Sequence, residues 1–485
     1  MKDFPYTVRE TFFMRRIISL LLCAAAILFV APLFSCNETT VQNSCYLDLF
    51  YDSEAGIISG KAAYKFVNSS NEMLNKIKFN LYPNAYSEKN KAFFEGYKDA
   101  YYQGESFGGI KILSCSSGEK SFDFSVSEDE LTLEVLCDEI LPGKTAEAVI
   151  EFETTLPKAR LRLGITENAV NLGEFYPALC KIDENGFVPT GYHSFGDPYF
   201  SDVFDYRADI NVPSAFTVAC SGSPEKTVID GDRTNYSFSL KNGRYFAFAL
   251  SDKFNVSAIK SGNTDIYYYS ALPENGKIDE IRKYFDFYSS EFGGYPYKTF
   301  SVAETGLFCG GAEFSGLCFI SDKSDDENKL SAALHETAHQ WWGAIVGNDQ
   351  TTDGYIDEGL CEYSAYLYLL SSGQTEAADN MINKAKAAYK SFFDIKSLFS
   401  GNADTNMNRP LNAYANEEEY VAITYRKSLV MFAELEKTVG EKKNVAAMKK
   451  LYKDNKFKNV GLSELTKAFG RKEYFESFVN GKVII

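Results

Sequence analysis

The sequence predicts an α+β protein with a strand-rich first half and a helix-rich second half. Between residues 44 and 255, short alternating or aromatic runs are separated by Gly, Pro, Asn and Asp residues, which is typical of an antiparallel β sandwich or saddle. From about residue 274 onward, apolar residues recur at helical spacing instead. Aromatic residues make up 15% of the 485 residues, so both halves have enough large side chains to build a core.

Six segments of the first half carry the strand pattern most clearly: 60–70, 76–86, 128–137, 146–156, 205–213 and 233–240. A helix should begin near Glu274 and end at Gly293, with four apolar side chains on one face: Ile278, Ile281, Tyr284 and Phe285. We therefore expect a β domain over residues 37–256, followed by a mainly helical domain with a small sheet over residues 257–485.

The first 36 residues have the pattern of an export signal or a membrane anchor. Arg15 and Arg16 precede an uninterrupted apolar run from Ile17 to Phe34, as in a secretory signal. The run leads into Leu-Phe-Ser-Cys ending at Cys36, which resembles a bacterial lipobox and favours a lipoprotein. Because the run is also close to the minimum length that spans a bilayer, an uncleaved signal anchor stays open. In either case we expect membrane association, with the rest of the chain outside the cytoplasm in the cell envelope.

Charge and cysteine usage exclude some classes of protein. The net charge of −16 argues against a nucleic-acid partner, because a duplex binder needs a basic face. The ten cysteines are dispersed and include no Cys-x-x-Cys pair, so a thiolate zinc site or a redox motif is not expected. We expect buried cysteines that act as small apolar residues, although a Cys115–Cys137 bridge is left open. The sequence does not indicate an oligomeric state.

The candidate metal-binding and catalytic residues lie in one short stretch, His335-Glu336-Thr337-Ala338-His339. We expect a helix from about Ser324 to Gly347, on which residues four apart share a face, so His335 and His339 can converge on one metal ion. A catalytic zinc ion needs three protein ligands and one open position. Glu336 is badly placed to be the third ligand but can reach a water molecule as a general base.

The third ligand must therefore come from another element. Glu358 follows His339 after 18 intervening residues, which leaves room for a second helix from about Ile356 to Ser371 to run back beside the first. On that helix Glu362 is four residues after Glu358, hence on the same face, and could hold the second nitrogen of a ligand histidine. We expect Trp341 and Trp342 to pack in the core behind the site.

The runs HETAHQWWG (335–343) and YIDEGLCEY (355–363) resemble the gluzincin zinc aminopeptidases of the aminopeptidase N and leukotriene-hydrolase type. The resemblance implies a thermolysin-like catalytic domain that binds one Zn²⁺ ion. It also implies peptides as substrates. Residue by residue, it implies that the metal ligands are His335, His339 and Glu358 and that the general base is Glu336.

The family's Gly-Ala-Met-Glu-Asn motif appears here as residues 310–314 with the sequence Gly-Gly-Ala-Glu-Phe. The resemblance implies that Glu313 binds the free amino group of the substrate and that Gly310 and Gly311 line the peptide. It also identifies Tyr425 as the candidate oxyanion donor, with Tyr420 nearby. Ala312 and Phe314 depart from the family pattern, and no glutamine of the β domain matches the one that many relatives supply to the amino group.

The most specific expectation is thus a zinc aminopeptidase that removes N-terminal residues from peptides. The degenerate motif at 310–314 keeps a zinc endopeptidase on the same scaffold as an alternative. A non-catalytic surface binding protein is a third possibility, although such a protein would be expected to lack the base or a ligand, and here both are present.

Overall fold

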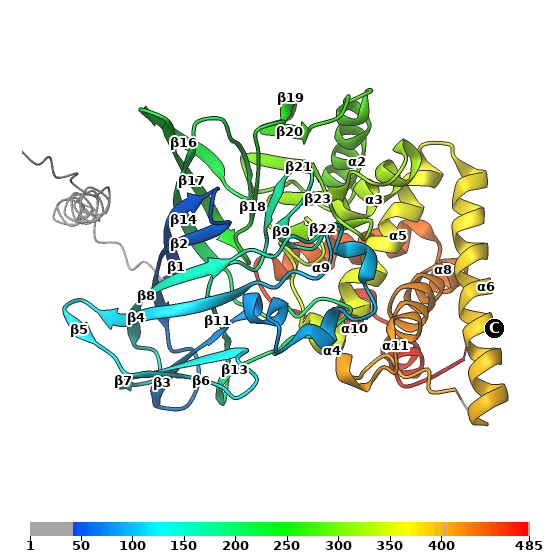
Figure 1. The fold of residues 1–485 in the computed structure, drawn as a ribbon. Coiled ribbons are helices and arrows are strands. Elements are labelled where there is room, and N and C mark those ends of the chain that lie inside the picture. Colours follow the sequence, from blue (N-terminus) through cyan, green and yellow to red (C-terminus); the bar gives the residue numbers. More distant parts are fainter. Residues whose placement is uncertain (1–41, 402, 484–485) are drawn as a thin grey trace, which may run out of the picture. The chain divides into compact units, whose positions relative to one another are not determined.

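The computed structural model describes residues 42–401 and 403–483, and residues 42–485 form one compact unit. The expected export signal or anchor, with Arg15, Arg16 and Cys36, lies outside the described residues and stays a prediction. Among the helices of the described part, none combines the length and the apolar character that crossing a bilayer requires. Strands fill one side of the ribbon and helices the other, in agreement with the predicted fold class (Figure 1).

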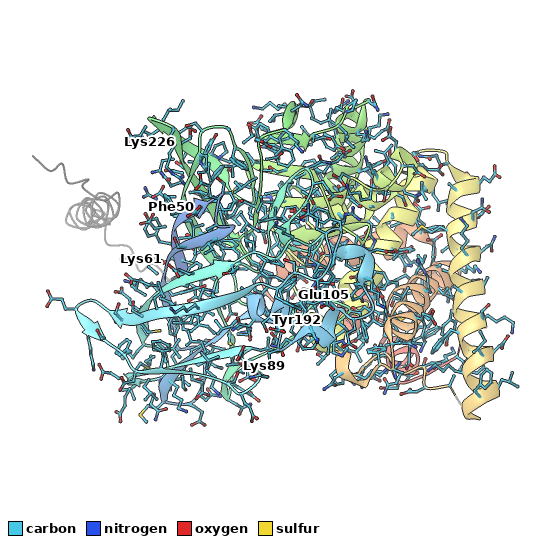
Figure 2. The ribbon with its side chains drawn as sticks, viewed as in Figure 1. Phe50, Lys61, Lys89, Glu105, Tyr192 and Lys226 are labelled. Atoms are coloured by element: carbon cyan, nitrogen blue, oxygen red, sulfur yellow. The ribbon has the colours of Figure 1, made fainter. Side chains whose placement is uncertain are left out.

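An eight-stranded sheet forms the largest part of the first half. Its strand order is β16 (Ser223–Asp230), β17 (Arg233–Gly243), β14 (Phe204–Pro213), β1 (Ser44–Asp52), β2 (Ile57–Val67), β8 (Thr145–Thr155), β4 (Gly109–Ser117) and β5 (Lys120–Ser121). All neighbours pair antiparallel except β1 and β14, which run parallel. Burial alternates along β1, so one face packs on the core while Phe50 and, on β2, Lys61 lie on the outer face (Figure 2).

Smaller sheets complete the β half. One has the order β11 (Ala178–Leu179), β3 (Leu74–Asn80), β7 (Thr132–Ile140) and β6 (Phe124–Val126). Another has the order β15 (Thr217–Cys220), β18 (Phe248–Ser251), β10 (Val170–Leu172) and β9 (Leu163–Ile165), and β12 (Lys181–Asp183) pairs with β13 (Gly186–Val188). The strand expected over 76–86 was wrong beyond Asn80. Because Pro83 cannot donate a ladder hydrogen bond, the chain turns there into the 3₁₀ helix η1 (Tyr82–Tyr86).

A five-stranded sheet opens the second half. Its order is β19 (Asn255–Ser261), β20 (Thr264–Ser270), β21 (Thr299–Thr305), β23 (Leu317–Ser321) and β22 (Gly311–Phe314), with β22 at one edge and antiparallel to β23. The helix predicted near Glu274 is α2 (Lys277–Glu291), and its four predicted core residues are buried. Glu274 itself accepts hydrogen bonds from the backbone N–H groups of Gly276 and Ile278, so it caps the helix instead of starting it. No observation tests the boundary expected at residues 256 and 257, which stays a prediction.

Helices make up the remainder of the chain. They are α3 (Asp326–Ala338), α4 (Gln350–Asp353), α5 (Tyr355–Ser371), α6 (Thr375–Ser400), α7 (Glu417–Tyr420), α8 (Ser428–Val439), α9 (Glu441–Asn455), α10 (Leu462–Phe469) and α11 (Lys472–Val479). The buried guanidinium of Arg244, at the end of β17, donates to the carbonyl oxygens of Ser201, Ala344 and Lys458. These hydrogen bonds connect the strand-rich half to the helical half.

The expected helix from Ser324 to Gly347 was wrong at its C-terminal end, because α3 stops at Ala338. The Ala344 N–H bonds the His339 carbonyl, and Gly343 has a left-handed φ of 116°. In this segment, which follows the end of α3, the side chains of Trp341 and Trp342 are fully buried. Their indole N–H groups donate to the Gly293 carbonyl and the Ser364 hydroxyl at 2.8 and 3.0 Å. Packing of this tryptophan pair therefore overrides the helical pattern.

The described cysteines carry free thiols, so the structure contains no Cys115–Cys137 bridge. Six of the eight are buried, as expected for small apolar residues: Cys45, Cys115, Cys180, Cys220, Cys318 and Cys361.

Candidate metal centre and active site

Helix α3 presents the two histidines of the motif on one face. The Asp325 side chain caps it by accepting a hydrogen bond from the Asn328 backbone N–H, and acidic residues fill its first turn. His335 lies in the last turn, and His339 follows one turn later in a helical conformation with φ of −59°. Their imidazoles face each other, with 3.1 Å between the two Nε2 atoms.

Glu358 reaches this pair from α5, which begins one residue earlier than predicted. Its Oε2 lies 3.1 Å from Nε2 of His335 and 3.5 Å from Nε2 of His339. Burial raises the pKa of the Glu358 carboxyl, but His339 and His335 outweigh this effect and hold the pKa below its ordinary value. A carboxylate therefore faces the two imidazoles.

The donor set fits a zinc ion. The Nδ1–H of His339 donates to the Trp342 carbonyl at 3.0 Å, which leaves a lone pair on Nε2. On the other histidine, Nδ1 of His335 lies 3.3 Å from Oε1 of Glu362, so this nitrogen is directed away from the centre as well. Two imidazole nitrogens and one carboxylate oxygen, all mutually close, are a typical ligand set for catalytic zinc with one position open. The structure thus brings together the three predicted ligands and places Glu362 behind His335.

Glu336 follows His335 in α3, and its side chain lies beside Gly311 of β22. Its side chain is buried, and its Oε2 has no hydrogen-bond partner among the described residues. Burial raises the pKa of the Glu336 carboxyl to about 7, an effect partly offset by His335 and His339. A carboxyl group that titrates near neutral pH is suited to accept and release a proton.

Tyr425 lies on η5 (Val421–Lys427), a π-helix between α7 and α8. Its hydroxyl donates to Oε1 of Glu358 at 2.5 Å, and its ring stacks on His335 with 6.1 Å between centroids. The next residue, Arg426, pairs with Glu362 at 3.3 Å, so η5 is attached to α5 at two points one turn apart. The predicted oxyanion donor therefore lies beside the predicted metal ligands, and the Tyr420 ring lies 5.9 Å from its ring.

Glu313 lies on the edge strand β22, where its Oε1 accepts a hydrogen bond from Gln350 at 3.1 Å. Gly311, two residues earlier on the same strand, leaves no room for a side chain, because a Cβ there would lie 2.5 Å from Cγ of Glu336 and would force that side chain to move. Gly310 is less constrained, since a Cβ there would approach Cβ of Ala332 only to 3.6 Å. The two glycines thus differ in role, and Gly311 is the one that allows the strand to pass beside Glu336.

Sequence reasoning missed a charged cluster that the β half contributes near Glu313. The guanidinium of Arg162 pairs with Asp197, lies 4.0 Å from Glu174 and also interacts with Glu313. The two oxygens of Glu174 accept hydrogen bonds from the hydroxyls of Tyr199 and Tyr86 at 2.6 and 2.7 Å. Two carboxylates thus contact one guanidinium, and Glu313 is close enough to feel its charge. These residues are distant in the sequence and form no motif, and Glu174 adopts a left-handed φ of 61° that the sequence does not reveal.

Comparisons with known proteins agree with this geometry. The family model described as the Peptidase family M1 domain matches residues 278–481. Human endoplasmic reticulum aminopeptidase 1 is 26% identical over 152 residues, which cover 27% of this chain and only 16% of that protein.

Solved structures share the fold. The M1 zinc metallopeptidase from Deinococcus radiodurans has a TM-score of 0.63 at 15% identity, with 92% of this chain and 95% of that chain covered. A mutant of that enzyme bound to a Tyr-Ser-Ala substrate has a TM-score of 0.62 at 16% identity over 92% and 95% of the two chains. The predicted fold class, the predicted family and the predicted zinc ion are thus confirmed. Residues 278–481 thus carry a Peptidase family M1 domain, the domain of the predicted gluzincin family, whose zinc metallopeptidases hold one catalytic zinc ion.

Proposed function

We propose that this protein is an aminopeptidase that removes single residues from the N-terminus of peptides. The observation that carries the proposal is the position of Glu313, whose carboxylate lies within 4.8 Å of a ring nitrogen of the proposed metal ligand His339. In a peptide, the terminal nitrogen and the first carbonyl carbon are only about 2.5 Å apart. An ammonium group paired with Glu313 would therefore place the first peptide bond at the metal centre.

The charge around Glu313 supports a cationic ligand. Glu174 and Glu313 together exceed the single positive charge of Arg162, even though burial raises the pKa of Asp197 well above its ordinary value, so this end of the site carries surplus negative charge. A substrate ammonium would complete the balance through charge-assisted hydrogen bonds. A blocked, neutral N-terminus would leave the surplus uncompensated, which favours an aminopeptidase over an endopeptidase.

The proposed chemistry divides among five side chains and the metal. His335, His339 and Glu358 would hold the zinc ion, which when bound acts as a Lewis acid that polarises the carbonyl and activates water near neutral pH. Glu336 accepts a proton from the attacking water and delivers it to the leaving amine. The Tyr425 hydroxyl donates a hydrogen bond to the developing oxyanion, which requires it to turn from Glu358 towards the substrate.

Glu313→Ala tests the aminopeptidase assignment. We expect KM for an aminoacyl chromogenic substrate to rise by about 10- to 100-fold with a smaller change in kcat, because a hydrogen bond to a charged group contributes about 1.5–3 kcal/mol. An N-acetylated peptide of the same sequence serves as the control. If the wild-type protein cleaves the blocked peptide as well as the free one, the endopeptidase alternative holds and Glu313 is no amine anchor.

Tyr425→Phe tests the oxyanion donor. We expect kcat to fall by about 10²- to 10³-fold with little change in KM, because the donor acts on charge that develops only in the transition state. Tyr420→Phe is the matched control, since its ring packs against the Tyr425 ring. A larger loss in the Tyr420 variant than in the Tyr425 variant would reassign the role to Tyr420.

A further inference from the structure

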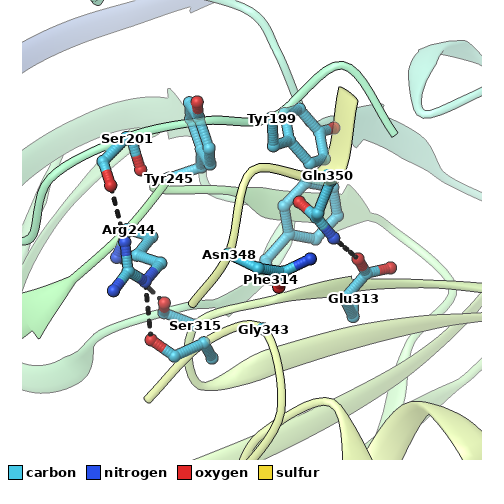
Figure 3. Close-up of a pocket in the computed structure, with 11 residues that line it drawn as sticks. Tyr199, Ser201, Arg244, Tyr245, Glu313, Phe314, Ser315, Gly343, Asn348 and Gln350 are labelled. Carbon is cyan, nitrogen blue, oxygen red and sulfur yellow. Dashed lines mark hydrogen bonds between the residues drawn. The ribbon is translucent and has the colours of Figure 1, made fainter. Parts of the chain in front are cut away.

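Gln350 connects the proposed amine anchor to a buried carboxylate beside the metal centre. It is the first residue of the short helix α4, and its side-chain Nε2 donates to Oε1 of Glu313 at 3.1 Å (Figure 3). The same Nε2 donates to Oδ2 of Asp357 at 2.7 Å. A primary amide has two N–H donors, so each carboxylate receives one of them. Glu313 is thus fixed through one oxygen by a neutral group.

Both Asp357 and the backbone of Gln350 are held by further hydrogen bonds. Oδ1 of Asp357 accepts a hydrogen bond from Nδ2 of Asn348 at 2.8 Å, and the backbone N–H of Gln350 donates to the Tyr199 carbonyl at 3.0 Å. Asp357 is buried and lies on α5 next to the proposed ligand Glu358. Gln350 therefore ties the edge strand that carries Glu313 to the helix that carries a metal ligand.

A small cavity of about 30 Å³ borders both Gln350 and Glu313. Tyr199, Tyr245, Phe314 and Asn348 are among the residues that line it (Figure 3). Its volume is large enough for one or two water molecules. Because Gln350 borders it, the two hydrogen bonds to carboxylates, and not close packing on all sides, determine where its amide lies.

We propose that Gln350 is a positioning residue that orients Glu313 to receive the ammonium group of the substrate. This inference rests on the proposed function. The amide is suited to the task because it donates to the carboxylate without cancelling its charge. A lysine at this position would neutralise Glu313, and a glutamate would repel it.

Gln350→Met is the decisive variant, because methionine has a similar size and no donor. We expect KM for the aminoacyl substrate to rise roughly tenfold with kcat little changed, and no change for the N-acetylated peptide. The zinc content should stay at the wild-type level. Gln350→Glu, which adds a charge between Glu313 and Asp357, should raise KM further and serves as the second variant if methionine disturbs the fold. Thr352→Ala, in the same short helix, is the control and should leave KM unchanged.

The double variant Glu313→Ala/Gln350→Met separates the possible outcomes. If Gln350 acts through Glu313, the double variant has the KM of Glu313→Ala alone. If Gln350→Met raises KM by the same factor in the Glu313→Ala background as in the wild type, the positioning role is overturned. It is also overturned if neither Gln350 variant changes KM although Glu313→Ala raises it. If Glu313→Ala itself leaves KM unchanged, the proposed amine anchor fails, and with it the role of Gln350.

Discussion

Glu336→Gln is expected to lower kcat by about 10²- to 10⁴-fold while the protein keeps its zinc ion. Glutamine has the same shape but cannot accept a proton. The wild-type carboxyl is buried beside the imidazole pair, its Oε2 has no partner among the described residues, and burial raises its pKa to about 7. All three features are those of a proton carrier. The measurement is kcat on an aminoacyl substrate together with the zinc content of the purified variant.

Glu327→Gln is the matched control for this experiment. It makes the same chemical change in the first turn of the same helix, where the side chain is exposed, and it should leave kcat unchanged. Near wild-type turnover in Glu336→Gln with a full complement of zinc would remove the general-base assignment. Loss of zinc in this variant would show instead that Glu336 supports metal binding.

Glu358→Gln is expected to weaken zinc binding by more than about 100-fold, and activity should be lost in proportion. The variant replaces a charged oxygen by a neutral one in a site where the carboxylate faces two imidazoles at 3.1 and 3.5 Å. Outer hydrogen-bond partners of metal ligands alone typically contribute about 10- to 100-fold to affinity, so a ligand should contribute more. Competition with a chelator, followed by zinc analysis, measures the effect.

Glu362→Gln is the corresponding control on α5, four residues further along. Glu362 lies behind His335, with 3.3 Å between its Oε1 and Nδ1 of the imidazole, so its replacement should weaken zinc binding by about 10- to 100-fold only. A greater loss of zinc from Glu362→Gln than from Glu358→Gln would contradict the assignment of the third ligand.

Local sequence patterns predicted the core of the site because that core is helical. Residues four apart share a helix face whatever the tertiary context, so the approach of His335 to His339 follows from spacing alone. The expected second helix with Glu358 also forms, within one residue of its predicted start. The C-terminal end of α3 could not be predicted, because burial of Trp341 and Trp342 ends that helix and depends on partners far away in the chain.

The proposed amine-binding part of the site, around Glu313, depends on contacts that local sequence patterns do not predict. Arg162, Glu174 and Asp197 belong to three separate loops of the β half, and only the folded chain brings them near Glu313. Gln350 lies in a polar stretch without a recognisable motif, so its hydrogen bond to Glu313 could not be predicted from the sequence either. A motif found by spacing thus predicts the metal site, whereas the proposed amine-binding site is assembled from residues that are distant in the sequence.

Zinc-edge anomalous diffraction from crystals of the protein tests the central claim most directly, because it locates the ion without reference to activity. We expect one peak per chain, at about 2.0–2.2 Å from Nε2 of His335, Nε2 of His339 and a carboxylate oxygen of Glu358. A peak bound to other side chains, with these three residues free, would contradict the account.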